Sequence, residues 1–309
     1  MTPRPTLIDC DPGTDDAIAL WLALASPELD VRLVTAVGGN VGLAHTLRNA
    51  RAVVGLAGSA VPVVAGADRA LTAPYVDAAH VHGDNGLGGL ILPDGPAAMP
   101  GVAADAMRAV LREAAPRSVT VIGLGPATNL GLVFATEPAL AGRVAEIVLM
   151  TGAVGEGNVT PSAEFNAWND PEALAIVLGC GAPVALATLD VTNQALCTGA
   201  EIAALRAAGQ GACAAAAARI WEGVKPSRRS GGRGHEQHDA CAVAWAVAPG
   251  LFVGTPVFVE VDCGPGLGRG RLSVDRWGRR GQAANATLLE RLDAPRFFTL
   301  LTARLAALP

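Results

Sequence analysis

The sequence predicts an α/β fold: a single domain with a mostly parallel sheet and helices on both faces. Along most of the 309 residues, β-rich runs alternate with stretches of helical periodicity, which is typical of a parallel sheet. Hydrophobic residues make up 51% of the chain and charged residues only 17%, so the chain can bury a large core. Because neither an internal repeat nor a clear linker interrupts this pattern, we expect residues 1–309 to form one domain.

The first strand and the first helix are expected to meet at an acidic turn. Leu7 and Ile8 read as the end of a buried strand, and Pro12-Gly13 makes the turn. A helix should begin near Asp15, because acidic side chains in a first turn interact favourably with the helix dipole. The carboxyl end of this strand therefore carries four acids within eight residues, Asp9, Asp11, Asp15 and Asp16. Open α/β sheets bind their ligands at such an edge.

The alternation continues through the first third of the chain. Residues 31–37 are β-rich and end at Asn40, residues 43–56 have helical periodicity, and residues 61–65 form another strand candidate. Residues 66–101 are polar and rich in glycine, so we expect a long functional or mobile loop. On spacing alone, Asn40 could point toward the acids or be an ordinary turn residue.

The remaining elements follow in the same alternating order. We expect a helix over 102–115, a strand over 119–124, a helix through 134, a strand over 146–150, a helix from 170, a strand over 184–189, and helices over 200–224 and 240–247. Pro171 in a first turn is a good helix-start signal. The uncharged run 240–259 is long enough to span a membrane, but Pro and Gly interrupt it, so a helix, a turn and a buried strand are expected. Further strands and a last helix over 293–308 complete the chain.

The clustered acids predict a cation site. Carboxylates this close raise one another's pKa unless a positive charge compensates them. Oxygen ligands without a nearby histidine or thiolate cluster favour a hard ion such as Ca²⁺ or Mg²⁺. The alternative is an acidic loop with a helix N-cap, and Asp239 could likewise be only an N-cap.

Composition disfavours several classes of partner. The formal net charge is −5 and the only lysine is Lys225, so we expect no nucleic-acid partner. The six cysteines include no C-x-x-C pair, which predicts free thiols and a cytoplasmic location. A strand begins within the first six residues, so neither a signal peptide nor a membrane partner is expected.

The stretch from Asp9 to Ala17 closely resembles the signature of the inosine–uridine-preferring nucleoside hydrolases. Further matches follow in the family's order over essentially the whole chain, at Gly39-Asn40, His82-Gly83, Met150, Glu164-Phe165-Asn166, 189–192 and His238-Asp239. The resemblance implies a homodimer or homotetramer that binds one Ca²⁺ per chain and hydrolyses the N-glycosidic bond of ribonucleosides.

The resemblance also implies roles by motif position. The calcium ligands would be the side chains of Asp11, Asp16 and Asp239 and the backbone carbonyl of Leu124. Asp11 would also be the catalytic base, and the catalytic His238 would face the nucleobase. The implied substrate-binding residues are Asp15, Asn40, His82, Met150, Asn158, Glu164, Phe165 and Asn166.

This chemistry agrees with the residue types. Breaking a ribosyl C–N bond develops positive charge on the sugar, which carboxylates stabilise. A cation lowers the pKa of a water beside Asp11, and a histidine can protonate the leaving base near neutral pH. If their segment is extended, Glu164 and Asn166 lie on one side of it, and fixed groups of these types suit the sugar hydroxyls that the resemblance assigns to them.

One departure from the family concerns residues 225–237, ahead of the His-Asp pair. Many relatives carry tyrosines there, whereas the only tyrosine of this chain is Tyr75. The segment is basic and rich in glycine, which predicts a mobile loop. The departure from the family leaves two alternatives: His235 or an arginine contacts the base, or the base preference is shifted. The choice between purine and pyrimidine therefore stays open, and outside the family's context His82 could be a surface histidine.

Two other functions are compatible with parts of the pattern. A haloacid-dehalogenase-type phosphatase shares the Asp-x-Asp start, but it needs a lysine near the phosphate and Lys225 lies in a Lys-Pro loop. A non-catalytic nucleoside- or calcium-binding protein could keep the site without turnover. The presence of both Asp11 and His238 speaks against it.

Overall fold

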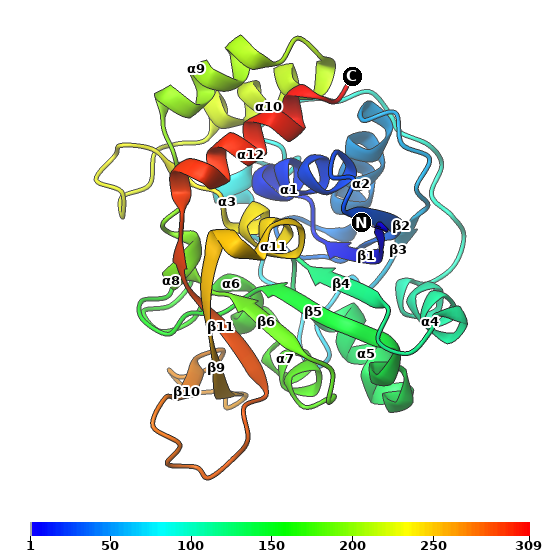
Figure 1. The fold of residues 1–309 in the computed structure, drawn as a ribbon, viewed down its shortest axis with the longest axis vertical. Coiled ribbons are helices and arrows are strands. Elements are labelled where there is room, and N and C mark those ends of the chain that lie inside the picture. The colour runs from blue at the N-terminus through cyan, green and yellow to red at the C-terminus, as the bar shows by residue number, and fades with distance from the viewer. Residues whose placement is uncertain (1) are drawn as a thin grey trace.

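A sheet of nine strands runs through the computed structural model, which describes residues 2–309 (Figure 1). From one edge to the other, the strands are β10 (Leu272–Asp275), β9 (Phe252–Val261), β11 (Ala286–Leu292), β6 (Val184–Ala187), β5 (Val144–Met150), β4 (Val119–Gly123), β1 (Arg4–Cys10), β2 (Leu29–Ala36) and β3 (Val63–Ala65). Neighbouring strands from β11 to β3 are parallel, while β9 is antiparallel to both β11 and β10. The prediction of a mostly parallel α/β sheet is confirmed.

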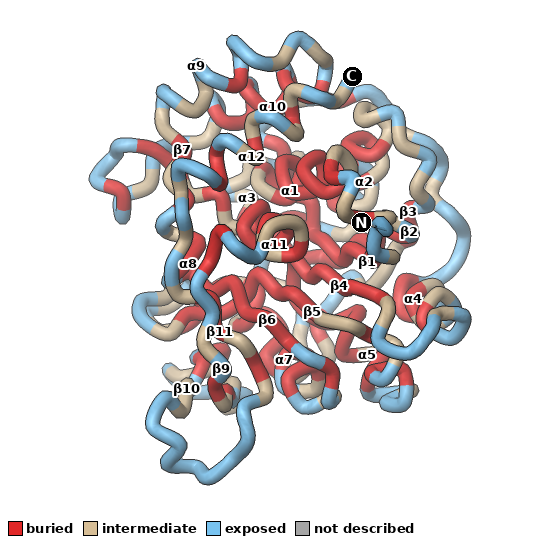
Figure 2. Tube along the Cα trace, viewed as in Figure 1, coloured by how far each residue is buried: buried red, intermediate tan, exposed pale blue. Residues whose placement is uncertain are grey.

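Helices cover both faces of this sheet (Figure 1). One layer contains α1 (Thr14–Leu24), α2 (Leu43–Leu56), α10 (Ala212–Gly223), α11 (His238–Val247) and α12 (Ala294–Ala306), with α9 (Gly199–Ala208) outside α10 and α12. The other layer contains α4 (Ala103–Glu113), α5 (Thr128–Thr136) and α7 (Pro171–Leu178). Each layer packs on its own hydrophobic cluster, and Figure 2 shows the central strands buried between the two.

Short elements connect these layers. They are α3 (Ala79–His82), α6 (Phe165–Asn169), α8 (Leu189–Thr192), the 3₁₀ helices η1 (Pro138–Arg143) and η2 (Pro249–Leu251), and the antiparallel pair β7 (Leu196–Cys197) and β8 (His235–Glu236). Within the described residues 2–309, no helix has the length and apolar character needed to cross a membrane.

Most expected elements are present, but three expectations were wrong in detail, and one condition set by the sequence is not met. The 200–224 region is two helices, because the segment 209–211 separates α9 from α10. The strand expected to reach residue 189 ends at Ala187, since α8 begins at Leu189. The condition that residues 164–166 form one extended piece is not met: Glu164 has an extended backbone, but it is the N-cap of α6, and its carboxylate accepts the N–H of Asn166 and Ala167. The strand β9 is only partly buried, since its antiparallel pairing leaves part of it facing solvent.

The order of the strands creates a switch point beside β1. The chain runs from β1 to β2 and β3 on one side and then returns to β4 on the other side of β1. Ligands of open α/β sheets bind outside the carboxyl ends of the strands at such a point. In register, Cys10 pairs with Ala36, and Asp9 pairs with Gly123. The segments that follow these strands therefore open onto the same edge.

Candidate active site

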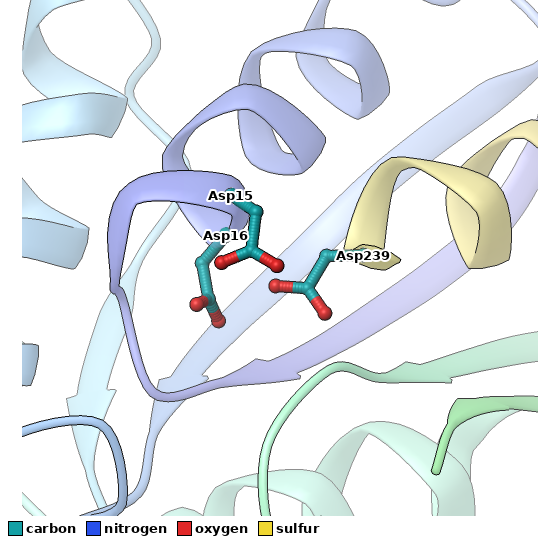
Figure 3. A group of neighbouring side chains, drawn as sticks. All are labelled: Asp15, Asp16 and Asp239. Carbon is teal, nitrogen blue, oxygen red and sulfur yellow. The ribbon is translucent and has the colours of Figure 1, made fainter. Parts of the chain in front are cut away.

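Three carboxylates converge at this edge of the sheet (Figure 3). Asp15 and Asp16 lie in the first turn of α1, and Asp239 lies in the first turn of α11. One oxygen of each lies within 4.8 Å of the others. The helices α1 and α11 pack against each other, which brings Asp239 to the turn after β1. Asp16 and Asp239 are buried, whereas Asp15 is half-buried.

Asp11 is buried beside this cluster. Its backbone N–H donates to Asp16 Oδ1 over 3.1 Å, and its own Oδ2 accepts the backbone N–H of Asn40 at 2.7 Å. Its Oδ1 is buried and has no hydrogen-bond partner within residues 2–309. A Cβ atom on Gly39 would lie 2.1 Å from Oδ2, and one on Gly125 would lie 2.5 Å from Oδ1. The close approach of these two glycines therefore fixes the carboxylate, and neither position can carry a larger residue without a shift.

The Asp16 side chain is held by three donors. Besides the Asp11 amide, the Gly13 N–H donates to Asp16 Oδ2 at 2.9 Å, and Asn40 Nδ2 donates to the same oxygen at 3.0 Å. Asn40 Nδ2 also donates to the Asp11 carbonyl at 3.2 Å. Asn40 therefore joins the end of β2 to the acidic turn, so of the two alternatives that spacing left open, the structure has Asn40 pointing toward the acids.

Asp9 belongs to a different environment. Its Oδ1 accepts Thr35 Oγ1–H at 2.6 Å and Asn129 Nδ2–H at 2.8 Å. Burial raises the pKa of Asp9 to about 7, although these two hydrogen bonds oppose the rise. Its role in the structure is to join β1, β2 and α5.

The electrostatics of the converged acids favour a cation. Burial raises the pKa of Asp11 well above its usual range, and Asp16 adds to the rise. Burial and then the charge of Asp15 raise the pKa of Asp239 well above its usual range and that of Asp16 to about 6. A hard cation would offset this mutual repulsion. The buried, unsatisfied oxygen of Asp11 and the all-oxygen donor set fit such an ion.

Asn166 connects the ends of β4 and β5. Its Nδ2 donates to the Leu124 carbonyl at 2.7 Å and to the Met150 carbonyl at 3.0 Å, and it lies 3.7 Å from Met150 Sδ. Glu164 accepts three backbone N–H groups, from Gly152 and Asn166 at 2.8 Å and from Ala167 at 3.1 Å. The carboxylate of Glu164 therefore anchors the segment that carries Asn166.

Both predicted histidines are oriented by threonines. The Thr14 N–H donates to His82 Nδ1 at 3.2 Å, so a neutral His82 ring carries its proton on Nε2. Thr192 Oγ1 lies 2.7 Å from His238 Nδ1. Burial lowers the pKa of both histidines, which favours their neutral forms.

A cavity of about 470 Å³ opens over these groups. The predicted residues that line it are Asp15, Asn40, His82, Leu124, Met150, Asn158, Glu164, Phe165, Asn166, His238 and Asp239. Asp11 and Asp16 contact this set through the hydrogen bonds described above. Asn158 lies in an exposed loop, where its Oδ1 accepts the Phe165 N–H at 2.9 Å. The structure thus brings together the sequence-predicted residues from both halves of the chain.

Apart from His235, which was already considered as a contact of the base, the remaining lining residues had no assigned role in the sequence. An apolar part of the wall consists of Ala78, Val81, Val159, Ile220, Trp221 and Val224. Polar lining residues outside the predicted set are Thr14, His80, Lys225, Ser227, His235, Glu236 and Gln237. The Ala-rich helix that supplies Ile220 and Trp221 carries no motif. Only the departure from the family around residues 225–237 pointed to this wall.

The sequence of this chain is similar to those of known proteins of one family. The model of the inosine–uridine preferring nucleoside hydrolases matches residues 6–299. The pyrimidine-specific ribonucleoside hydrolase RihA of Citrobacter koseri is 40% identical over 307 residues, which is 98% of each chain. The protein of the same name from Klebsiella pneumoniae is also 40% identical, over 98% of each chain.

Solved structures agree with this result. The purine-preferring ribonucleoside hydrolase from Gardnerella vaginalis has a TM-score of 0.91 and 31% identity, with 98% of each chain covered. A plant nucleoside hydrolase also has a TM-score of 0.91, with 29% identity and 99% of each chain covered. The chain therefore belongs to the inosine–uridine preferring nucleoside hydrolase family and is a glycosidase that hydrolyses ribonucleosides.

Proposed function

We propose that this enzyme is a Ca²⁺-dependent ribonucleoside hydrolase that releases ribose and a free base. The observation that carries the proposal is the convergence of Asp15, Asp16 and Asp239 beside the buried Asp11, next to a cavity of about 470 Å³. A cavity of this volume is large enough to enclose one nucleoside.

The ion would be held by oxygen ligands from four residues. They are the side chains of Asp11, Asp16 and Asp239 and the backbone carbonyl of Leu124. Ca²⁺ takes about six to eight oxygen ligands, so the protein would leave room for sugar hydroxyls and water. When bound, the ion would neutralise the carboxylates and lower the pKa of a nearby water. Asn166 would support the site by orienting the Leu124 carbonyl, to which it donates.

Asp11 would act as the catalytic base. One of its oxygens is occupied by the Asn40 N–H, which leaves Oδ1 to take a proton from the attacking water. As water attacks C1′ and the C–N bond breaks, positive charge develops on the ribosyl group. The negative charges of Asp11, Asp15 and Asp239 would stabilise that transition state.

Four residues would hold the ribose hydroxyls, and Met150 would lie against the sugar. Asp15 is the half-buried member of the acid cluster, and it lines the cavity. Asn166 uses its Nδ2 on two carbonyls, which leaves its Oδ1 to accept a sugar O–H. Asn40 and Glu164 would provide the remaining contacts. Glu164 lines the cavity, and its three backbone bonds fix the orientation of its carboxylate there.

His238 would protonate the leaving base, and His82 would hydrogen-bond it. In both rings, Nδ1 is hydrogen-bonded to a threonine, so Nε2 is the nitrogen that would face the base. Asn158 and Phe165 would border the same end of the cavity. Protonation makes the base a better leaving group, which is where a histidine acid contributes.

We propose pyrimidine ribonucleosides as the preferred substrates. This is supported by the names of the relatives that are 40% identical, which are pyrimidine-specific. The purine-preferring relative of known structure is less similar, at 31% identity.

We further propose that residues 1–309 act as one domain within a homodimer or homotetramer in the cytoplasm. A single sheet connects all parts of the described chain. Leu267 and Trp277 are 97% and 83% exposed, and apolar side chains of this size suit a contact between subunits. Six free cysteines suit a reducing compartment.

The decisive experiment measures ribose release from uridine, cytidine, inosine and adenosine before and after chelation. Release that stops on chelation and returns with Ca²⁺ supports the proposal, and the substrate ranking tests the pyrimidine preference. Tight binding of an intact nucleoside without turnover would instead indicate a binding protein. Mg²⁺-dependent release of phosphate from a phosphomonoester would indicate a phosphatase.

A further inference from the structure

One wall of the cavity is formed by the end of α10 and by the segment 225–237. Ile220, Trp221 and Val224 give this wall an apolar surface, which suits the flat face of a nucleobase. The polar groups on the same wall must then decide how the edge of the base is recognised.

Two polar side chains of this wall are already engaged. Gln237 Oε1 accepts the Trp221 indole N–H at 2.8 Å. Glu236 Oε1 accepts the Ser227 hydroxyl at 2.6 Å. These groups stabilise the wall itself and are poorly placed to exchange partners with a substrate.

His235 differs from these neighbours. It is only 6% exposed, it lines the cavity, and its buried Nε2 has no hydrogen-bond partner in the described part of the chain. Its backbone is fixed because β8 pairs with β7, where His235 lies opposite Cys197. A Cβ atom on the adjacent Gly234 would lie 2.1 Å from the Cys197 carbonyl oxygen, so the two strands are in close contact. The ring is therefore held at the wall of the cavity.

An unpaired buried nitrogen in a residue that lines a cavity is unfavourable until a partner reaches it, which needs a small shift of the ring when a ligand binds. Burial also lowers the pKa of His235, so the ring is neutral near pH 7 and carries one N–H donor. Nucleobases such as uracil and hypoxanthine present carbonyl oxygens that can accept this donor. Since His82 and His238 already account for the proposed leaving-group chemistry, His235 is available for recognition.

We propose that His235 is a specificity-determining residue that donates a hydrogen bond to a carbonyl oxygen of the nucleobase. The inference rests on the proposed function, because it requires a nucleoside in this cavity. His235 would contact the base away from the bond that breaks, and it would therefore select among bases rather than assist cleavage.

The test compares the unaltered enzyme with His235→Ala on four substrates. They are uridine, 2-thiouridine, 4-deoxyuridine and p-nitrophenyl riboside, which has no base carbonyl. If His235 binds a base oxygen, His235→Ala lowers kcat/KM for uridine by about tenfold, the usual size of one lost hydrogen bond, and has a far smaller effect on p-nitrophenyl riboside. Each analogue changes one of the two base oxygens. In the unaltered enzyme, the analogue that changes the oxygen bound by His235 has a kcat/KM about tenfold below that of uridine, and this difference disappears in His235→Ala.

Two controls make the result specific to His235. His235→Gln replaces the imidazole N–H with an amide N–H donor, so it should recover part of the preference for uridine over its analogues. The same variant replaces His235→Ala in the test if His235→Ala folds poorly. Arg219 is an exposed residue of α10, the helix that supplies the apolar part of this wall, and Arg219→Ala should match the unaltered enzyme on all four substrates. If the enzyme prefers inosine to uridine, inosine replaces uridine in this test, and purine riboside, which lacks the base carbonyl, replaces the two uridine analogues.

Two results would overturn the inference. One is that the ratio of kcat/KM for each analogue to kcat/KM for uridine is the same in His235→Ala as in the unaltered enzyme. The other is an equal loss on uridine and p-nitrophenyl riboside, which would indicate a purely structural role. Absence of ribose release by the unaltered enzyme would instead contradict the proposed function itself.

Discussion

The backbone N–H of Asp11 donates to Oδ1 of Asp16 over 3.1 Å, which locks two buried acids of one turn together. The contact explains how adjacent carboxylates keep a fixed arrangement despite their repulsion. Replacing the Asp16 side chain would therefore leave the Asp11 N–H without its partner, whereas a substitution at Asp11 would keep this hydrogen bond.

Replacing Asp11 with Asn should abolish turnover. The substitution removes the proposed base and one proposed calcium ligand, so we expect kcat to fall by roughly three orders of magnitude or more. Ribose release and calcium content of the purified variant measure the two effects. Asp9→Asn is the matched control, because Asp9 binds Thr35 and Asn129, and it should keep its calcium. Full activity of Asp11→Asn would exclude Asp11 as the base.

Chelation should make folding stability depend on pH in a defined direction. The folded pKa of Asp16 is about 6 against an ordinary value of 3.8, so the folded chain without metal binds this proton more tightly than the unfolded chain does. The stabilising contribution is therefore present below about pH 4 and is lost as the pH rises to about 6. Asp11 and Asp239 shift in the same direction.

Thermal unfolding of chelated and Ca²⁺-loaded protein from pH 4 to pH 7 measures this effect. Calcium should raise Tm most at the upper end of the range, because it binds the ionised carboxylates of the folded state. A Ca²⁺-induced increase in Tm that does not change with pH would contradict the assignment of these carboxylates as ligands.

His238→Ala should slow natural nucleosides far more than p-nitrophenyl riboside. An activated leaving group does not need protonation, whereas a nucleobase does, and loss of a general acid costs about 100-fold or more. The ratio of kcat values for uridine and p-nitrophenyl riboside is the measurement. Thr192→Val removes only the partner of His238 Nδ1 and should have a smaller effect in the same direction. Equal losses on both substrates would rule out the acid role.

Gly39→Ala should lower both activity and calcium affinity. The added Cβ atom would lie 2.1 Å from Asp11 Oδ2, so the carboxylate must move. We expect kcat/KM to fall by about 100-fold, which is typical of misplaced catalytic groups. Gly42→Ala is a matched control three residues away, because in the described chain no heavy atom beyond its own chain neighbours lies within 4 Å of its Cβ position. Similar losses in both variants would point to a general effect on this loop.

Local chemistry made much of the fold predictable. The turn at Pro12-Gly13 and the acids at the start of α1 depend on neighbouring residues alone, and the helix predicted over 43–56 is present with the same bounds. One-residue spacing would place Glu164 and Asn166 on one side only if residues 164–166 were extended. They form a cap and a helix start instead, since Glu164 accepts backbone N–H groups of the following turn.

The sequence by itself determined the class of the fold, the acidic turn and the identity of the candidate site residues. These follow from the period of apolar residues and from motifs whose members are close in the chain. Only the tertiary structure placed Asp239 beside Asp16, because that contact depends on the packing of α1 against α11. It alone left His235 with an unpaired nitrogen at the cavity wall, since hydrogen bonding between distant segments depends on how the two sides of the cavity meet.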